Sequence, residues 1–293
     1  DMTWLARARA DSTPGLVDAA VAQLGGFGEN DNRNAVQRDR FTTAMATHII
    51  RAERPNLLLI HLMETDSAQH ADGPGSDAAR AAIERIDAHI GALVRATDEA
   101  GIRERTTFIV SGDHGFSRVH ALIQPNVVLR DAGLLTTDER GRITSWQAAA
   151  HAMAIRLRDP NDRALAKKAE QAFTTLADGR YRGIFRVITR GELDMRGAYP
   201  DAAFFVEPAE GYYVSDGVAG GTVLVGTTRR GAHGFLPTEV RMHTGLISAG
   251  AGVRPGVPLP LVRQIDIAPT VARLLGFDMP KADGLPIVGL LKD

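Results

Sequence analysis

The sequence predicts an α/β protein with a mostly parallel central sheet that is flanked by helices. Two unbroken apolar runs, at residues 56–62 and 107–111, are typical of strands that are covered on both faces. Between them, apolar residues recur every three or four positions, as on one side of an amphipathic helix. A strand, a helix and a strand at this spacing form a βαβ unit, in which the two strands are parallel.

The other helices of the first half are predicted from periodicity and from residues that begin or end helices. Residues 14–24 indicate a short helix that begins at a proline, and residues 39–52 indicate an amphipathic helix. The helix of the βαβ unit is expected to begin at Ser76 or Asp77 and to end at Gly101.

The second half is less regular. Residues 119–132 favour a helix, whereas residues 139–220 alternate short β-like runs with one polar helix near 161–177. We interpret 139–220 as an α+β insertion or subdomain beside the main sheet. Buried-strand patterns return at 222–226 and 244–249, and a final helix follows them.

Composition excludes several functional classes. The chain has 293 residues, of which 44% are hydrophobic and 24% charged, and its net charge of −1 favours no nucleic-acid partner. It contains no apolar run near the roughly 20 residues of a membrane span. The absence of cysteine excludes disulfides and thiolate zinc ligands, although it does not decide the cellular compartment.

Both strands of the βαβ unit are followed by an aspartate and a histidine, which are Asp66 with His70 and Asp113 with His114. Ligands of open α/β sheets bind outside the carboxyl ends of the strands, so the two motifs are expected at one edge. Carboxylates and imidazoles suit Zn²⁺ or Mn²⁺. His233, in the glycine-flanked sequence RRGAHGF, is a third candidate ligand.

Each motif also has a simpler interpretation. Asp66 suits a helix N-cap beside a surface histidine, and Asp-His-Gly is common turn chemistry. A glycine-flanked histidine such as His233 is ordinary in a loop. The three motifs together are more specific than any one of them.

In combination, D-x3-H, D-H-G and G-x-H-G resemble the alkaline phosphatase superfamily, and most closely its nucleotide pyrophosphatase/phosphodiesterase branch. Residues 242–257 and 266–287 are similar to the later strand and the closing helix of that branch. The resemblance covers roughly residues 50–130 and 220–290. It implies one alkaline phosphatase-like α/β domain over residues 1–293.

The resemblance implies two zinc ions, with Mn²⁺ as an alternative metal. Asp66, His70 and His233 correspond to the ligands of one ion, and Asp113 and His114 to ligands of the other. In the family, the second ion also needs an aspartate that ends an earlier strand, and a threonine or serine acts as the nucleophile.

No residue of this chain matches that upstream pair. Ser12 and Thr13 lie beside a helix start, but no metal-binding aspartate follows a strand before them. Thr42 and Thr43 lie inside a predicted helix. The nucleophile and the missing ligand are therefore expected before residue 1, and the chain is expected to be N-terminally incomplete.

The resemblance predicts a two-zinc hydrolase of phosphate diester or pyrophosphate bonds that acts on a small-molecule phosphate ester. The alternatives are a phosphomonoesterase, a phosphonoacetate hydrolase, a sulfatase, or a metal-binding chain without activity. Thr65, Ser111 and His243 are candidates for orienting the histidine ligands. The resemblance favours a periplasmic or extracellular location, and the sequence does not indicate an oligomeric state.

Overall fold

The computed structural model of the protein describes residues 3–25, 28, 32–218 and 221–292. The chain forms two compact units, each built from separate stretches of sequence. We call them the first unit (Asp1–Ala68, Asp77–Asp113 and Thr244–Asp293) and the second unit (Gln69–Ser76 and His114–His243). Residues 139–220 lie within the second unit, and their assignment as an insertion in one domain stays a prediction.

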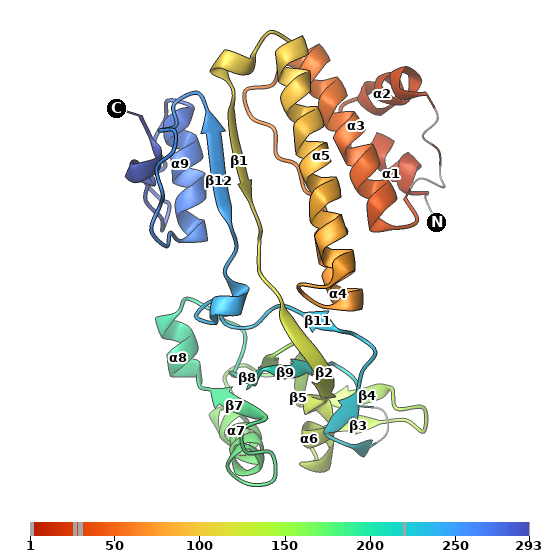
Figure 1. The fold of residues 1–293 in the computed structure, drawn as a ribbon. Helices are drawn as coiled ribbons and strands as arrows, with labels where there is room; N and C mark the ends of the chain where they lie inside the picture. The colour runs from red at the N-terminus through yellow and green to blue at the C-terminus, as the bar shows by residue number, and fades with distance from the viewer. Residues whose placement is uncertain (1–2, 26–27, 29–31, 219–220, 293) are drawn as a thin grey trace. The chain divides into compact units, whose positions relative to one another are not determined.

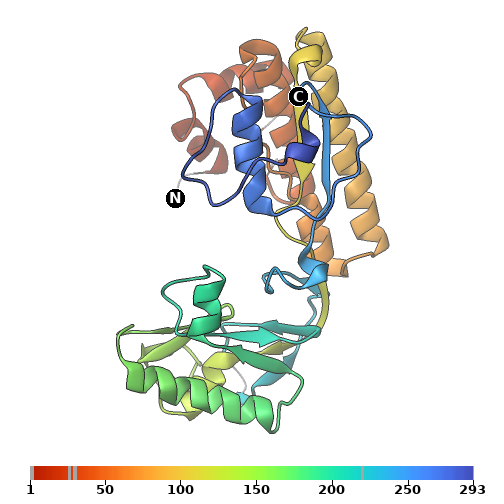
Figure 2. The ribbon, with the colours of Figure 1, turned by 90° about the vertical axis from the view of Figure 1, so that its left-hand side faces the viewer.

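The first unit is rich in helices. Its core joins Ala46 and Ile50 of one long helix to Leu93 and Ala96 of another, and Figures 1 and 2 show these two helices side by side. The helices predicted at 14–24, 39–52 and from Asp77 onwards are confirmed, with ends shifted by a few residues. The helices are α1 (Trp4–Ala10), α2 (Leu16–Leu24), α3 (Ala35–Glu53), α5 (Asp77–Glu99) and α9 (Ile267–Leu274), and α4 (Glu64–Asp72) continues into the second unit.

The first unit also contains a two-stranded ladder. β1 (Thr107–Ser111) pairs antiparallel with β12 (Leu246–Gly250), and Ile109 lies opposite Ser248. In Figures 1 and 2 this ladder runs between α9 and α5. The strands predicted at 107–111 and 244–249 are therefore present.

The structure corrects the prediction for residues 56–62. This segment has no strand assignment, so the expected parallel pairing with β1 is not observed. Leu57 and Leu59 are 50% and 83% exposed, whereas Leu58 and Ile60 pack against the core of the first unit. An apolar run favours an extended backbone. A strand also needs a partner strand from elsewhere in the chain, so the run alone does not determine strand pairing.

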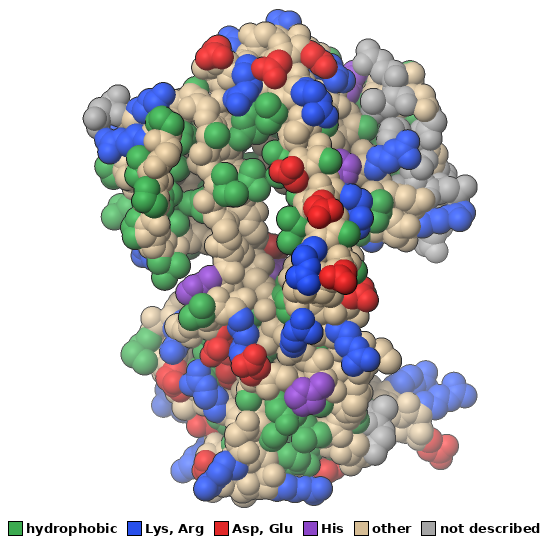
Figure 3. Space-filling model, viewed as in Figure 1, with side chains coloured by type: hydrophobic (Ala, Val, Ile, Leu, Met, Phe, Trp, Pro, Cys, Tyr) green, Lys and Arg blue, Asp and Glu red, His purple; other side chains and the backbone are tan. Residues whose placement is uncertain are grey.

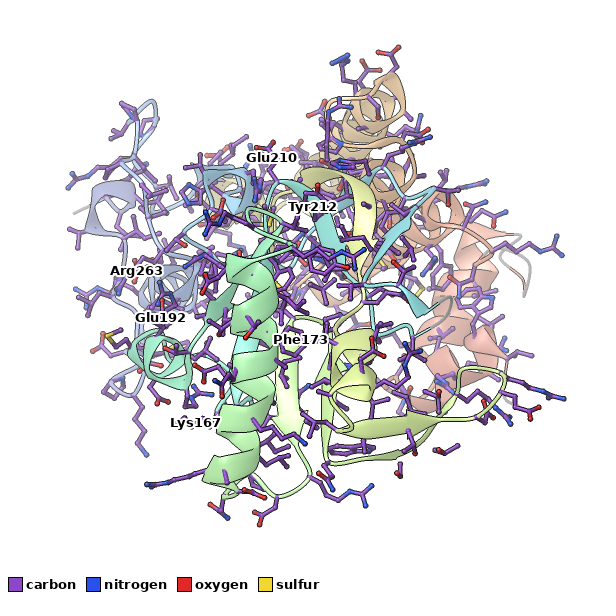
Figure 4. All side chains as sticks on the ribbon, turned by 90° about the horizontal axis from the view of Figure 1, so that it is seen from below. Lys167, Phe173, Glu192, Glu210, Tyr212 and Arg263 are labelled. Atoms are coloured by element: carbon purple, nitrogen blue, oxygen red, sulfur yellow. The ribbon has the colours of Figure 1, made fainter. Side chains whose placement is uncertain are left out.

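The second unit contains a four-stranded antiparallel sheet in the order β5-β6-β8-β7. Phe204 and Val206 pack with Phe173 of α7 on one face, while Phe205 packs with Leu193 of α8 on the other. Figure 2 shows the two helices on opposite sides of this sheet, and Figure 4 shows Phe173 projecting from α7. The elements are β5 (Ala148–His151), β6 (Ala154–Leu157), α7 (Arg163–Asp178), β7 (Phe185–Ile188), α8 (Arg190–Met195) and β8 (Phe204–Pro208).

A second sheet of this unit is centred on β2 (Ser117–Ile123), which pairs antiparallel with β10 (Leu224–Gly226) and β11 (Gly231–Ala232). β2 also pairs parallel with β9 (Gly211–Val214), the one parallel pairing in the described part of the chain. The α/β class is confirmed, but the expectation of mostly parallel pairing is not met there. The remaining elements are α6 (Pro125–Asp131), β3 (Leu135–Thr137) and β4 (Ile143–Trp146).

The helix predicted at 119–132 is half correct. Residues up to Ile123 form β2, and a helix begins only at Pro125. Proline lacks a backbone N–H and is tolerated at the first position of a helix, so the helix begins at this residue.

The surface of both units mixes charges, and Figure 3 shows acidic and basic side chains interspersed on the face it presents. Large apolar side chains are also exposed in the first unit, among them Ile247 at 70% and Leu261 at 80%. Within the described ranges, no helix has the length and apolar character needed to cross a bilayer.

Candidate metal centre

Helix α4 carries two of the predicted ligands. Asp66 and His70 lie four residues apart on this continuous helix, so both project from the same side of it, one turn apart. At its start, the buried carboxylate of Asp39 accepts hydrogen bonds from the backbone N–H groups of Met63 and Glu64, at 2.8–2.9 Å. This carboxylate from α3 satisfies N–H groups that the first turn of a helix leaves unpaired.

Three imidazoles gather around one buried ring in the second unit. The Nε2 atoms of His70 and His233 are 3.2 Å apart, and the rings of His114 and His233 stack with centroids 3.6 Å apart. Phe116, only 8% exposed, contacts all three rings edge-on at centroid distances of 4.9–5.5 Å. The packing of these rings against Phe116 and one another positions the three imidazoles.

The orientation of His70 is set by the strand that precedes His233. Its Nδ1 lies 2.9 Å from the carbonyl oxygen of Gly231. A carbonyl only accepts hydrogen bonds, so when Nε2 of His70 binds a ligand, the ring proton lies on Nδ1 and is donated to Gly231. The backbone N–H of Arg230 also donates to the carbonyl of His70, at 3.0 Å.

Gly231 is required at this close approach. A Cβ atom at this position would lie 2.2 Å from the carbonyl oxygen of Gln69, well inside van der Waals contact. The glycine two positions before His233 in the G-x-H-G motif therefore has a steric role. It lets the strand reach the helix that carries His70.

The ligand atoms of Asp66, His70 and His233 all lie within 4.8 Å of one another. Within the described ranges this is the one set of three or more acidic, histidine or cysteine side chains with that geometry. One carboxylate and two imidazoles form a donor set that suits Zn²⁺. The residues present therefore fit a divalent metal ion.

Asp113 and His114 are not part of that set. Asp113 ends the Asp77–Asp113 segment of the first unit, and the side chain of Gln264 donates a hydrogen bond of 2.7 Å to its carbonyl oxygen. His114 stacks on His233 in the second unit. Next to it, a Cβ at Gly115 would lie 2.1 Å from the carbonyl oxygen of Arg241, so the glycine of Asp-His-Gly is also required by close packing. Their assignment to a second metal ion stays a prediction.

A buried carboxylate also supports the segment that follows His233. Glu207, at the end of β8, is 3% exposed, and its Oε1 accepts a hydrogen bond of 3.2 Å from the backbone N–H of Leu236. Its Oε2 is buried and has no hydrogen-bond partner among the described residues. Burial raises the pKa of the Glu207 carboxyl, an effect that the Leu236 hydrogen bond only partly offsets.

Sequence reasoning did not identify Asp39, Glu207, Arg229 or the Gly231 carbonyl. Gly231 belongs to the G-x-H-G motif, but the motif does not indicate that its carbonyl contacts His70. Asp39, Glu207 and Arg229 each act on a residue that is distant in sequence. Of these residues, only Asp39 could have been identified from the sequence, because it lies among the apolar positions of α3. A charged residue among apolar positions of an amphipathic helix indicates a buried partner.

The model of the type I phosphodiesterase/nucleotide pyrophosphatase family matches residues 5–236. The chain belongs to this family. The resemblance to the alkaline phosphatase superfamily, based on Asp-x3-His, Asp-His-Gly and Gly-x-His-Gly, is thereby confirmed. No curated protein sequence shows a significant match.

Solved structures of the family share the fold. Human ectonucleotide pyrophosphatase/phosphodiesterase 5 matches with a TM-score of 0.68 at 18% identity, and the murine protein with 0.67 at 19%. An inactive threonine-to-alanine variant of the murine protein, in complex with AMP, matches with 0.66 at 18%. In each case the match covers 91% of this chain and 66% of the other, so the chain spans just under two thirds of their length.

Proposed function

We propose that this chain supplies most of the metal site of a hydrolase that cleaves phosphate diester or pyrophosphate bonds in a small-molecule phosphate ester. The observation that carries the proposal is the convergence of Asp66, His70 and His233 in a member of this family. In the proposal, these three residues hold one zinc ion. Asp113 and His114 belong to the site of a second ion.

Metal ions bound there would neutralise charge on a phosphate oxygen and lower the pKa of the attacking hydroxyl. The chain's own residues provide the arrangement. The Gly231 carbonyl keeps the proton of His70 on Nδ1, and Phe116 packs against the ring of His233. Asp39 anchors the start of the helix that carries Asp66.

In the proposal, the hydroxyl nucleophile is supplied by a residue located upstream of this chain. The helix predicted at 39–52 contains three hydroxyl residues, Thr42, Thr43 and Thr47. All three lie within α3, and Thr43 and Thr47 are 5% and 7% exposed. The hydroxyl of Ser12 donates to the carbonyl oxygen of Ala8 at 2.5 Å, an ordinary contact at the end of a helix. We therefore assign no nucleophile within the chain.

The proposal is tested by measuring zinc binding and hydrolysis with the full chain. Zinc affinity is measured by competition with a chromogenic chelator in the wild type and in His70→Ala and His233→Ala. Each variant is expected to lose at least about 10- to 100-fold in affinity. His151→Ala, which removes an exposed histidine of the same unit, is the matched control and should bind zinc as the wild type does.

Turnover is then measured with bis(p-nitrophenyl) phosphate and with p-nitrophenyl phosphate. A diesterase prefers the first substrate, and a clear preference for the monoester would overturn the diester assignment. Unchanged zinc affinity in both histidine variants would overturn the metal site itself.

A second candidate function is metal binding without catalysis. It is favoured by the lack of an assignable nucleophile in α3 and in the segment around Ser12. One zinc ion per chain with no hydrolysis of either ester would support it. Two zinc ions with turnover would instead support the hydrolase, with a nucleophile that the sequence analysis missed.

A further inference from the structure

Arg229 lies beside the proposed metal ligand His70. It belongs to the segment between β10 and β11, and its Nη1 lies 2.7 Å from Nδ1 of His70 and 3.4 Å from Nε2. The guanidinium carbon also lies 5.7 Å from the centroid of the Tyr213 ring. All three residues belong to the second unit.

The aromatic ring gives this arginine a defined position. Tyr213 packs against a cluster that includes the buried residues Val119, Ala232 and Phe235, so the ring itself is held in place. A guanidinium over an aromatic face is attracted to it and loses less conformational freedom when it binds a ligand. In the described part of the chain, Arg229 forms no ion pair with a carboxylate. Its charge is therefore available to an anion.

The contact with His70 is not compatible with a bound metal. Nδ1 of His70 has either a proton or a lone pair, and arginine only donates hydrogen bonds. When Nε2 binds a metal, the proton stays on Nδ1 and is donated to the carbonyl of Gly231. Arg229 then loses its acceptor on His70, and its N–H groups remain next to the metal site.

We propose that Arg229 is a substrate-binding residue that favours a pyrophosphate linkage over a simple diester. A pyrophosphate carries a second anionic phosphoryl group beside the phosphorus that is attacked. The planar guanidinium donates parallel hydrogen bonds to two oxygens of such a group. A diester with neutral substituents offers no equivalent charge. This inference rests on the proposed function, because it requires a phosphate group at the metal site.

The test measures ligand binding to the zinc-loaded full chain by isothermal titration calorimetry. The two probes are the symmetrical dimethyl ester of diphosphate, with two negative charges, and dimethyl phosphate, with one. Arg229→Gln is expected to weaken binding of the diphosphate ester about 10- to 100-fold, as for a lost charged hydrogen bond. Binding of dimethyl phosphate should change less than about threefold.

Two further variants separate charge from geometry. Arg229→Lys keeps the charge without the planar fork and is expected to give an intermediate loss. Arg158→Gln removes another exposed arginine of the second unit that lies over an aromatic ring, that of Trp146, and should leave both affinities unchanged. Zinc affinity, measured with the chelator, should be the same in all three variants.

The outcomes distinguish this inference from the proposed function. If the wild type binds no zinc, the metal site fails and the inference fails with it. If the wild type binds zinc but Arg229→Gln binds the diphosphate ester as tightly as the wild type, only the inference is overturned. An equal loss for both probes would also overturn it, since it would indicate a general disturbance of the site.

Discussion

Each unit of the protein buries a carboxylate that supports a segment carrying predicted metal ligands, and the two carboxylates differ in how well they are satisfied. Asp39 of the first unit, 1% exposed, accepts three hydrogen-bond contacts from two backbone N–H groups at the start of α4. Glu207 of the second unit, 3% exposed, accepts one from Leu236, and its second oxygen is unpaired among the described residues.

This difference shows that burial alone does not indicate whether a charged group stabilises a fold. Removing a carboxylate from water costs several kcal/mol unless hydrogen bonds or opposite charges replace the lost hydration. Asp39 has that replacement, and it also lies at the positive end of a helix dipole. Glu207 has it only in part, which is why burial raises its pKa. The first should therefore stabilise the chain, while the second should cost stability at neutral pH.

The largest effect is expected at Asp39. Replacing it with alanine leaves the N–H groups of Met63 and Glu64 without their acceptor inside the first unit. We expect Asp39→Ala to lower the free energy of unfolding by about 3 kcal/mol. The measurement is urea denaturation of the full chain with a chelator present, so that metal binding does not contribute.

The matched control for Asp39 is Asp18, an aspartate in the first turn of α2. It is exposed and pairs with Arg9 at 2.7 Å. Asp18→Ala is expected to change the free energy of unfolding by less than about 1 kcal/mol. Similar losses in the two variants would show that the buried hydrogen bonds add nothing beyond an ordinary surface carboxylate.

A smaller effect of opposite sign is expected at Glu207. Glu207→Gln keeps an oxygen for the N–H of Leu236 and removes the buried charge. At pH 8 the variant is expected to have a free energy of unfolding about 1 kcal/mol higher than the wild type. A loss of stability in this variant at pH 8 would show that the charge of Glu207 has a stabilising partner.

Glu207→Gln and the wild type also test how the free energy of unfolding depends on pH. The pKa of Glu207 is raised in the folded chain, so the folded state keeps its proton to higher pH than the unfolded state does. The contribution of Glu207 to stability is therefore full below the ordinary carboxyl pKa and is lost as pH rises through the folded-state pKa. The difference in stability between Glu207→Gln and the wild type should grow over that interval and then level off.

The smallest effect on the free energy of unfolding is expected for an exposed ion pair between two helices. Arg51 of α3 and Glu99 of α5 form an ion pair of 2.5 Å, with side chains 47% and 54% exposed. Arg51→Gln is expected to change the free energy of unfolding by less than about 0.5 kcal/mol, because water competes for both groups. A change in the free energy of unfolding above about 1 kcal/mol would contradict this expectation, because an exposed ion pair would then stabilise the first unit about as much as buried hydrogen bonds do.

Local patterns predicted much of the fold because their signals lie within a few residues of one another. The spacing of apolar residues along α3 and α5 is set by helical geometry and needs no distant partner. The same holds for the run of β1. Pairing could not be predicted in this way, since the run at 56–62 has no strand assignment and β1 pairs with a strand more than 130 residues later.

The candidate site shows the same contrast between residues that local patterns predict and contacts with residues distant in sequence. Asp66 and His70 were predicted from their place after an apolar run, and His233 from its glycine-flanked sequence and its resemblance to a family motif. The contacts that orient these ligands come from Asp39, the Gly231 carbonyl and the ring of Phe116. No sequence motif indicates these contacts.

By itself, the sequence determined the family, the helices with a clear apolar periodicity and the residue types that can bind a metal. These properties depend on local periodicity and on a few short motifs. Only the tertiary structure decided that Gly231 approaches the backbone of Gln69, that the charge of Asp39 is satisfied and that the charge of Glu207 is not. The physical reason is that a buried polar group loses its hydrogen bonds to water and needs replacement partners, which come from residues distant in sequence. The distances to these partners are set only when the chain has folded.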